Sequence, residues 1–139
     1  MKTQILALLA FLCLGTSALA QNQTITVYNT TCHDMEVIST WDLRKGSCTP
    51  SISQAAFIPP GGNAVFTGYL NTLPLIYIEA TENNGIGSAR SYNPFMGCGV
   101  DFPDAYNNGP CAGGMGYQIV FVNTWPNANN NWDVAIVSI

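Results

Sequence analysis

Short runs of residues that alternate between apolar and polar are the feature of this sequence that most limits its fold. Residues 24–29 read TITVYN, in which Ile25 and Val27 alternate with other residues, and residues 35–40 read MEVIST. Successive side chains of a strand point to opposite faces, so this pattern predicts strands with one buried face. Helical periodicity is nearly absent. We therefore expect an all-β fold in which these two runs are neighbouring strands.

Further strands are expected at residues 64–69, 75–80, 86–92, 117–125 and 132–139. The intervening PPGG (59–62) and ENNG (82–85) are predicted turns, because proline and glycine interrupt regular structure. The run 86–92 is the weakest, since its glycine is typical of an edge strand or a bulge. About seven or eight short strands separated by turns predict an antiparallel β-sandwich.

The first twenty residues have the composition of a signal peptide. Lys2 precedes the apolar run ILALLAFLCL, and GTSALA follows with Ala18 and Ala20 in the spacing of a cleavage site. We expect residues 1–20 to be removed and the mature chain to begin at Gln21. The apolar run is too short to span a bilayer, so we expect a secreted or periplasmic protein without membrane insertion. Residues 21–139 are then a single β-sandwich domain with a long irregular loop at 93–116.

Four cysteines lie beyond the predicted cleavage site, at positions 32, 48, 98 and 111. An even number in an exported chain predicts two disulfides. Of the three possible connectivities, we expect the one that is local in sequence, Cys32 with Cys48 and Cys98 with Cys111. With all four cysteines paired, a free catalytic thiol is not expected.

The charge balance excludes one class of partner. Without Lys2, three basic residues face eight acidic ones, a net charge of about −5 with histidine neutral. Binding to nucleic acid requires a basic stripe that neutralises phosphates, and the sequence has none. We expect no nucleic-acid partner and no attraction to anionic membrane surfaces.

Two tryptophans bracket the run PNANNN, and their role has two interpretations. If Trp125 and Trp132 face each other across a hairpin, Phe121 lies opposite Ile136, because residue pairs in an antiparallel ladder keep a constant sum. The tryptophan side is then a core face, and the other side is apolar as well, so the hairpin is expected to be covered on both faces. The rings either cap the core, the interpretation we favour, or form a ligand platform.

The irregular loop 93–116 carries the remaining candidate ligand residues. Aromatic rings and amides on one loop are typical of carbohydrate sites, because a sugar offers an apolar face and a rim of hydroxyls. The alternative is that the rings pack the loop onto the domain. The candidate ligand-binding residues are Phe102, Tyr106, Asn107, Asn108, Trp125 and Trp132.

The same loop offers oxygen ligands for calcium, with Asp101 and Asp104 as the candidates. Aspartate and asparagine are also common turn residues, and we favour that interpretation. No other cofactor is expected. The spacing does not match an EF-hand loop, whose ligands alternate and end in a glutamate.

Groups for catalysis are scarce. His33 is the single histidine and lies beside Cys32 in an expected turn, where a structural role is favoured over that of a general base. One histidine with paired cysteines also makes a zinc site improbable. A carboxylate pair, Glu79 with Glu82 or with Asp101, is the remaining enzymatic alternative.

A partial resemblance supports an exported β-domain. The segments ITVYNTTC (25–32), GSCTP (46–50) and IPPGG (58–62) together resemble an arrangement in small uncharacterised exported bacterial β-sandwich proteins. The N-terminal strand is also similar to that of thaumatin-like proteins, whose cysteine-rich central signature is absent here. Neither resemblance implies catalytic residues.

These observations predict a secreted, non-catalytic binding or surface-interaction module, with an extracellular glycan or protein as its partner. One alternative is a small secreted hydrolase that acts through a carboxylate pair. Another is a structural or inhibitory partner of a second exported protein.

Overall fold

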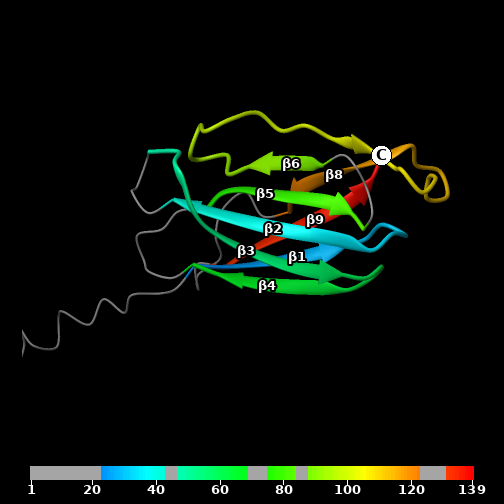
Figure 1. Ribbon diagram of the computed structural model, residues 1–139, viewed down its shortest axis with the longest axis horizontal. Helices are drawn as coiled ribbons and strands as arrows, with labels where there is room; N and C mark the ends of the chain where they lie inside the picture. The colour runs from blue at the N-terminus through cyan, green and yellow to red at the C-terminus, as the bar shows by residue number, and fades with distance from the viewer. Residues whose placement is uncertain (1–22, 43–46, 69–74, 84–87, 123–130) are drawn as a thin grey trace, which may run out of the picture.

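The computed structural model describes residues 23–42, 47–68, 75–83, 88–122 and 131–139, and shows a sandwich of two β-sheets (Figure 1). Within these residues, no helix is long and apolar enough to cross a membrane. The strands are β1 (Thr24–Asn29), β2 (Met35–Asp42), β3 (Pro50–Ile58), β4 (Asn63–Thr67), β5 (Leu75–Glu82), β6 (Ala89–Tyr92), β7 (Asp104–Ala105), β8 (Gly116–Phe121) and β9 (Asn131–Ser138).

The five-stranded sheet has the order β4-β1-β9-β8-β7, and the four-stranded sheet has the order β3-β2-β5-β6. Every pair of neighbours is antiparallel except β1 and β9, which run parallel. Figure 1 shows the four-stranded sheet as one layer and the five-stranded sheet as the other. The predicted all-β sandwich is confirmed.

The predicted pairing of the first two strands is wrong. β1 pairs with β4 and β9, whereas β2 pairs with β3 and β5 in the other sheet. The turn after β1 therefore crosses from one layer to the other. Alternation tells which side chains of a strand face inward, but it carries no information about which strand lies alongside.

Two strands were not predicted. β3 has the sequence PSISQAAFI, whose inward positions include Gln54 and Ala56 rather than large apolar side chains, so its alternation is weak. β7 has only two residues, held by pairing with β8. Gly116 makes that pairing possible, because a Cβ there would lie 2.3 Å from the carbonyl oxygen of Asp104.

The core lies between the sheets and is built mainly from the inward residues of the predicted alternating runs. Ile25 and Val27 of β1 are fully buried, as are Met35 and Val37 of β2. The other buried members of the main cluster are Trp41, Ile58, Phe66, Leu75, Ile78, Ala80, Ala89, Tyr117, Ile119, Trp132, Val134 and Ile136.

The C-terminal pair of strands has a different register from the one expected. Phe121 lies opposite Val134 rather than Ile136, a shift of two residues. Because side chains alternate with a period of two, this shift keeps every side chain on its expected face. The other face is not covered as expected, since Val120 and Val122 are exposed.

The two disulfides join Cys32 to Cys111 and Cys48 to Cys98, so the expected local pairing is wrong. Each bridge ties the loop 93–116 to an N-terminal segment. Cys32 precedes β2 and Cys48 follows it, so the eight residues of this extended strand keep the two cysteines apart and each pairs with a cysteine of the loop 93–116 instead.

Asn29 fixes the turn at the end of β1. Its side-chain amide donates hydrogen bonds to the carbonyl oxygens of His33 (2.7 Å) and Ile58 (2.9 Å), and its Oδ1 accepts from the amide of Thr31 (3.0 Å). Asn29-Thr30-Thr31 matches the pattern for N-glycosylation. In the folded protein the Asn29 side chain is fully buried, so its amide is not accessible for glycosylation.

Candidate functional site

Two groups of functional side chains stand out among the described residues. The first, which we call the Arg90 cluster, consists of Tyr77, Glu79, Arg90, Tyr92 and Phe102 on the outer face of the four-stranded sheet. Tyr77 and Glu79 alternate on β5, and their register partners on β6 are Tyr92 and Arg90. Alternation places all four side chains on one face of the sheet. Phe102 extends the row through a bridge to Arg90.

Arg90 is the centre of this cluster. Its Nε donates to Glu79 Oε2 at 2.9 Å, its Nη2 also contacts that oxygen, and its Nη1 donates to the Tyr92 hydroxyl at 3.4 Å. The guanidinium carbon lies 4.4 Å from the centroid of the Tyr77 ring and 5.5 Å from that of Phe102. These distances are typical of cation–π contacts.

The cluster keeps its charge and part of its hydrogen-bonding capacity. Partial burial lowers the pKa of Arg90, but the hydrogen bonds to Tyr92 and Glu79 outweigh that effect and leave the pKa above its usual value. A guanidinium has five N–H donors, and the bonds described above occupy three of them. Arg90 is 27% exposed and Phe102 is 40% exposed, so both are open to a ligand.

The edge of the cluster is held by the following loop. Asp101 accepts hydrogen bonds from the Ser91 hydroxyl (2.7 Å) and the Tyr92 amide (2.6 Å). Gly99 packs against the Tyr92 ring, since a Cβ there would lie 2.5 Å from the ring. The disulfide at Cys98 anchors the same loop. The backbone of this loop therefore holds the Tyr92 ring in place.

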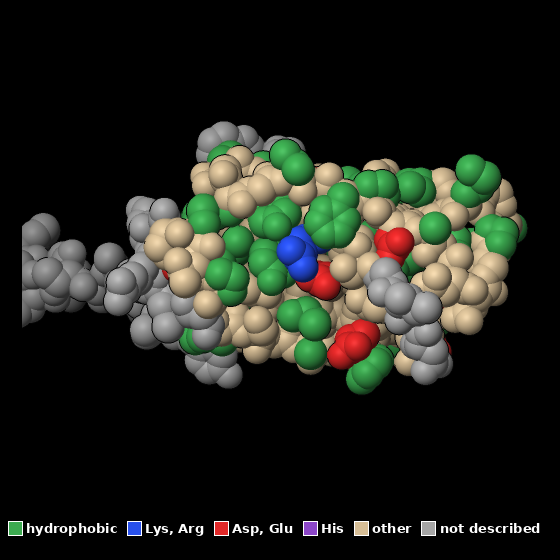
Figure 2. Space-filling model, turned by 45° about the horizontal axis from the view of Figure 1, so that its top comes forward, with side chains coloured by type: hydrophobic (Ala, Val, Ile, Leu, Met, Phe, Trp, Pro, Cys, Tyr) green, Lys and Arg blue, Asp and Glu red, His purple; other side chains and the backbone are tan. Residues whose placement is uncertain are grey.

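Figure 2 shows a face of the molecule on which a blue basic side chain lies among green hydrophobic side chains, with a red acidic side chain beside it. The row continues across the sheet to Ile38 of β2, the register partner of Glu79. The exposed Phe57 of β3 lies further along the same face.

The second group, which we call the His33 cluster, lies at one end of the sandwich and consists of Cys32, His33, Glu82, Asn108 and Cys111. His33 Nδ1 lies 3.0 Å from Glu82 Oε1, and His33 Nε2 lies 2.7 Å from the carbonyl oxygen of Gly109. A carbonyl oxygen only accepts, so Nε2 carries a hydrogen. With both nitrogens bound to oxygens of the protein, neither is open to take a proton from a substrate.

Glu82 joins three segments of the chain. It is 1% exposed and accepts hydrogen bonds from the Asn107 amide (2.7 Å) and from Asn108 Nδ2 (2.8 Å), in addition to its contact with His33. A buried carboxylate requires such donors. Glu82 therefore fixes the loop 106–111 and the turn 30–34 to the end of β5.

Aromatic rings support the His33 cluster from the core side. Tyr106 lies between His33 and Tyr117, with ring centroids 4.7 Å and 5.4 Å away. The Tyr117 hydroxyl accepts a hydrogen bond from the Glu82 amide at 3.3 Å. Burial is the largest cause that raises the pKa of Tyr117, and together with the carboxylates of Asp104 and Glu82, which repel a phenolate, it brings the pKa to about 12.

A cavity of about 290 Å³ opens beside the His33 cluster. Its lining is mainly polar and consists of Cys32, His33, Asp34, Pro60, Glu82, Asn83 and Asn108. Cys32 is exposed, whereas Cys111 is 7% exposed and lies behind it.

The structure separates the residues predicted to bind a ligand. Trp132 is 3% exposed and packs edge-on against Phe95 and Phe121, as expected of a ring that caps the core. Trp125 lies outside the described residues. Tyr106, Asn107 and Asn108 meet at the His33 cluster, and only Phe102 lies on the exposed Arg90 cluster.

The two candidate calcium ligands, Asp101 and Asp104, make their hydrogen bonds with different sheets. Asp101 accepts its hydrogen bonds from β6, whereas Asp104 belongs to β7 of the five-stranded sheet and accepts from the Ala105 amide. Asn107 and Asn108 are directed to Glu82. In the described part of the chain, the ligand atoms that gather closely are those of Cys32, His33 and Cys111.

Sequence reasoning missed both clusters. The Arg90 cluster was detectable in principle, because Arg90 and Tyr92 alternate on one predicted strand and Tyr77 and Glu79 on another. Only the pairing of β5 with β6 was lacking. The His33–Glu82 contact leaves no signal in the sequence, since it joins a turn to the end of a distant strand.

No protein-family model, curated protein or solved structure matches this chain.

Proposed function

We propose that the protein is a non-catalytic glycan-binding module and that the Arg90 cluster is its binding surface. The observation that carries this proposal is the row of Tyr77, Arg90 and Phe102, in which one guanidinium lies against two aromatic rings on an exposed sheet face. An aromatic ring packs against the C–H face of a sugar, and neighbouring polar groups bind its hydroxyls.

The polar groups of the cluster suit a neutral sugar. Arg90 retains N–H donors beyond those that bind Glu79 and Tyr92, while the carboxylate of Glu79 is an acceptor. The contact with Glu79 offsets the charge of Arg90, so the cluster presents donors and acceptors with little net charge. The chain as a whole is acidic, which disfavours polyanionic glycans.

The hydrolase alternative receives less support. Glu79 is paired with Arg90, and Asp101 is bound to Ser91 and the Tyr92 amide, so both carboxylates hold parts of the protein in place. Glu82 is buried under its own donors. A carboxylate that acts on a glycosidic bond must instead reach the substrate.

A glycan array on the oxidised protein tests the proposal, followed by titration of any bound glycan against variants. Phe102→Ala and Arg90→Ala are each expected to weaken binding by about tenfold, which is what the loss of about 1.4 kcal/mol of stacking or hydrogen bonding produces. Tyr28→Ala is the matched control, because Tyr28 is 39% exposed on the opposite sheet, close to the 40% of Phe102.

Either of two results would overturn the proposal. The first is that the array shows no glycan binding. The second is that a glycan binds equally well to the parent, Phe102→Ala and Arg90→Ala proteins.

A further inference from the structure

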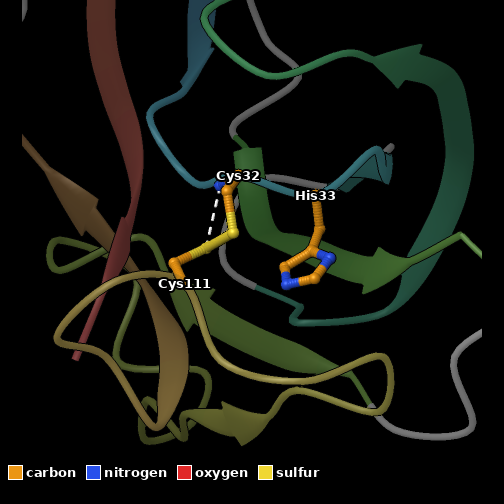
Figure 3. A group of neighbouring side chains, drawn as sticks. All are labelled: Cys32, His33 and Cys111. Atoms are coloured by element: carbon orange, nitrogen blue, oxygen red, sulfur yellow. Dashed lines mark hydrogen bonds between the residues drawn. A yellow bond between two sulfur atoms is a disulfide. The ribbon is translucent and has the colours of Figure 1, made fainter.

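The His33 cluster contains more ligand chemistry than its structural role requires. The sulfur atoms of Cys32 and Cys111 and a ring nitrogen of His33 all lie within 4.8 Å of one another. In the structure the two sulfurs form a disulfide, and Figure 3 shows the imidazole beside that bond. Two thiolates and one imidazole are ligands that zinc prefers. Ligand atoms that each lie about 2.0–2.3 Å from one zinc ion are separated from one another by distances of this size.

We propose that reduction of the Cys32–Cys111 disulfide converts this cluster into a binding site for a borderline-soft divalent metal ion such as Zn²⁺. The ligands are the two sulfurs and Nε2 of His33, and water completes the tetrahedral shell. The site is independent of the Arg90 cluster.

Glu82 orients the histidine for this role. Its Oε1 lies 3.0 Å from Nδ1, so the carboxylate holds the hydrogen on Nδ1 and directs Nε2 away from itself. Metal-binding histidines commonly donate their other ring hydrogen to a carboxylate in this way. Nε2 exchanges its contact with the Gly109 carbonyl oxygen for the metal ion.

The surroundings of the sulfurs favour both reduction and metal binding. Cys32 is exposed and lines the cavity, so an external thiolate can attack its sulfur. Cys111 is buried, and its sulfur is therefore the leaving group. The Cys32 amide donates to Cys111 Sγ at 2.9 Å. A hydrogen bond to sulfur stabilises its thiolate form, which is both the leaving group and the metal ligand.

The chemistry balances with a dithiol as the external reductant. One thiolate of the dithiol attacks Cys32 Sγ, the S–S bond breaks, and Cys111 leaves with the electron pair and takes a proton. The second thiol of the dithiol then displaces Cys32 as a thiol and forms the dithiol's own disulfide. When the divalent ion binds, the protons of the two thiols and of Nε2 pass to water.

The test uses Co²⁺ as a spectroscopic substitute for Zn²⁺ in the full chain with Cys13→Ser, Cys48→Ser and Cys98→Ser, which retains only the proposed pair of cysteines. After reduction, we expect one Co²⁺ per chain with thiolate-to-cobalt absorption bands, and loss of these bands when Zn²⁺ is added. Before reduction, the same protein should show no such bands.

Two variants separate a folded site from binding to an unfolded chain. His33→Ala is expected to weaken Co²⁺ binding at least tenfold. Glu82→Gln is expected to weaken it by about tenfold, the usual effect of removing the carboxylate behind a metal-bound histidine. In an unfolded chain Glu82 is far from the cysteines, and this substitution would leave the affinity unchanged.

The matched control is the chain with Cys13→Ser, Cys32→Ser and Cys111→Ser, which retains the other cysteine pair. This protein should bind Co²⁺ at least tenfold more weakly after reduction. Equal affinity in this control, in His33→Ala or in Glu82→Gln would overturn the proposal, as would the absence of thiolate-to-cobalt bands in the reduced parent.

Discussion

The carboxylate of Glu82 lies 3.0 Å from the imidazole of His33, although one ends β5 and the other belongs to the turn between β1 and β2. Glu82 is also bound by Asn107 and Asn108. The Cys32–Cys111 disulfide joins two of the same three segments, the turn after β1 and the loop before β8. The end of the sandwich is therefore fixed by both a covalent bond and the hydrogen bonds of a buried carboxylate.

Replacing Glu82 with glutamine is expected to lower the free energy of unfolding by about 2–3 kcal/mol, because charge-assisted hydrogen bonds to a buried group are lost. Urea denaturation measures the change. Glu36→Gln is the matched control on the outer face of β2, where the effect should stay within about 0.5 kcal/mol. Equal effects of the two substitutions would contradict the assigned role of Glu82.

Tyr117 is expected to make stability depend on alkaline pH. Its pKa is raised to about 12, so the folded state keeps the phenol protonated while the unfolded chain ionises near pH 10. The contribution of Tyr117 to stability is fully present below about pH 10 and is lost as the pH rises towards 12. Tyrosinate absorbance should show a late ionisation step that belongs to Tyr117. If Tyr117→Phe retains that late step, the assignment is wrong.

The disulfide connectivity is expected to appear directly in a digest made without reduction. Mass spectrometry should find the peptide of Cys32 joined to that of Cys111, and the peptide of Cys48 joined to that of Cys98. Since these bridges span 79 and 50 residues, the loop-entropy relation gives each a stabilisation of about 4 kcal/mol, against about 3 kcal/mol for local pairs. Peptides with the local pairing would contradict the structure.

Asn29→Ala is expected to lower the free energy of unfolding by about 3 kcal/mol, because it leaves buried carbonyl and amide groups of the turn without partners. Thermal or urea unfolding measures the loss. Asn63→Ala, on the exposed edge strand β4, is the control and should have an effect within about 0.5 kcal/mol. A loss below 1 kcal/mol for Asn29→Ala would show that the turn does not depend on this side chain.

The sequence predicted which side chains of a strand face the core better than it predicted which strands lie side by side. Ile25 and Val27 are buried as their alternation indicated, and Trp132 packs in the core. The pairing of β1 with β2 was predicted wrongly. β3 was missed because small and polar residues occupy some of its inward positions.

The prediction of the binding site was limited for the same reason. Phe102 was identified as a candidate ring, but its partners Arg90 and Tyr77 belong to other segments of the chain. Only the antiparallel pairing of β5 and β6, with the bridge from Arg90 to Phe102, brings the three side chains together.

The sequence by itself determined the all-β class, the inward faces of most strands and the presence of two disulfides. These properties can be read from the chain itself, because side-chain alternation belongs to a single strand and the number of cysteines does not depend on how the strands pack. The tertiary structure alone decided which strands are neighbours, which cysteines are joined and which groups meet around Arg90 and His33. Those contacts arise only when segments distant in sequence pack into two layers, and the alternation within each strand is compatible with several such arrangements.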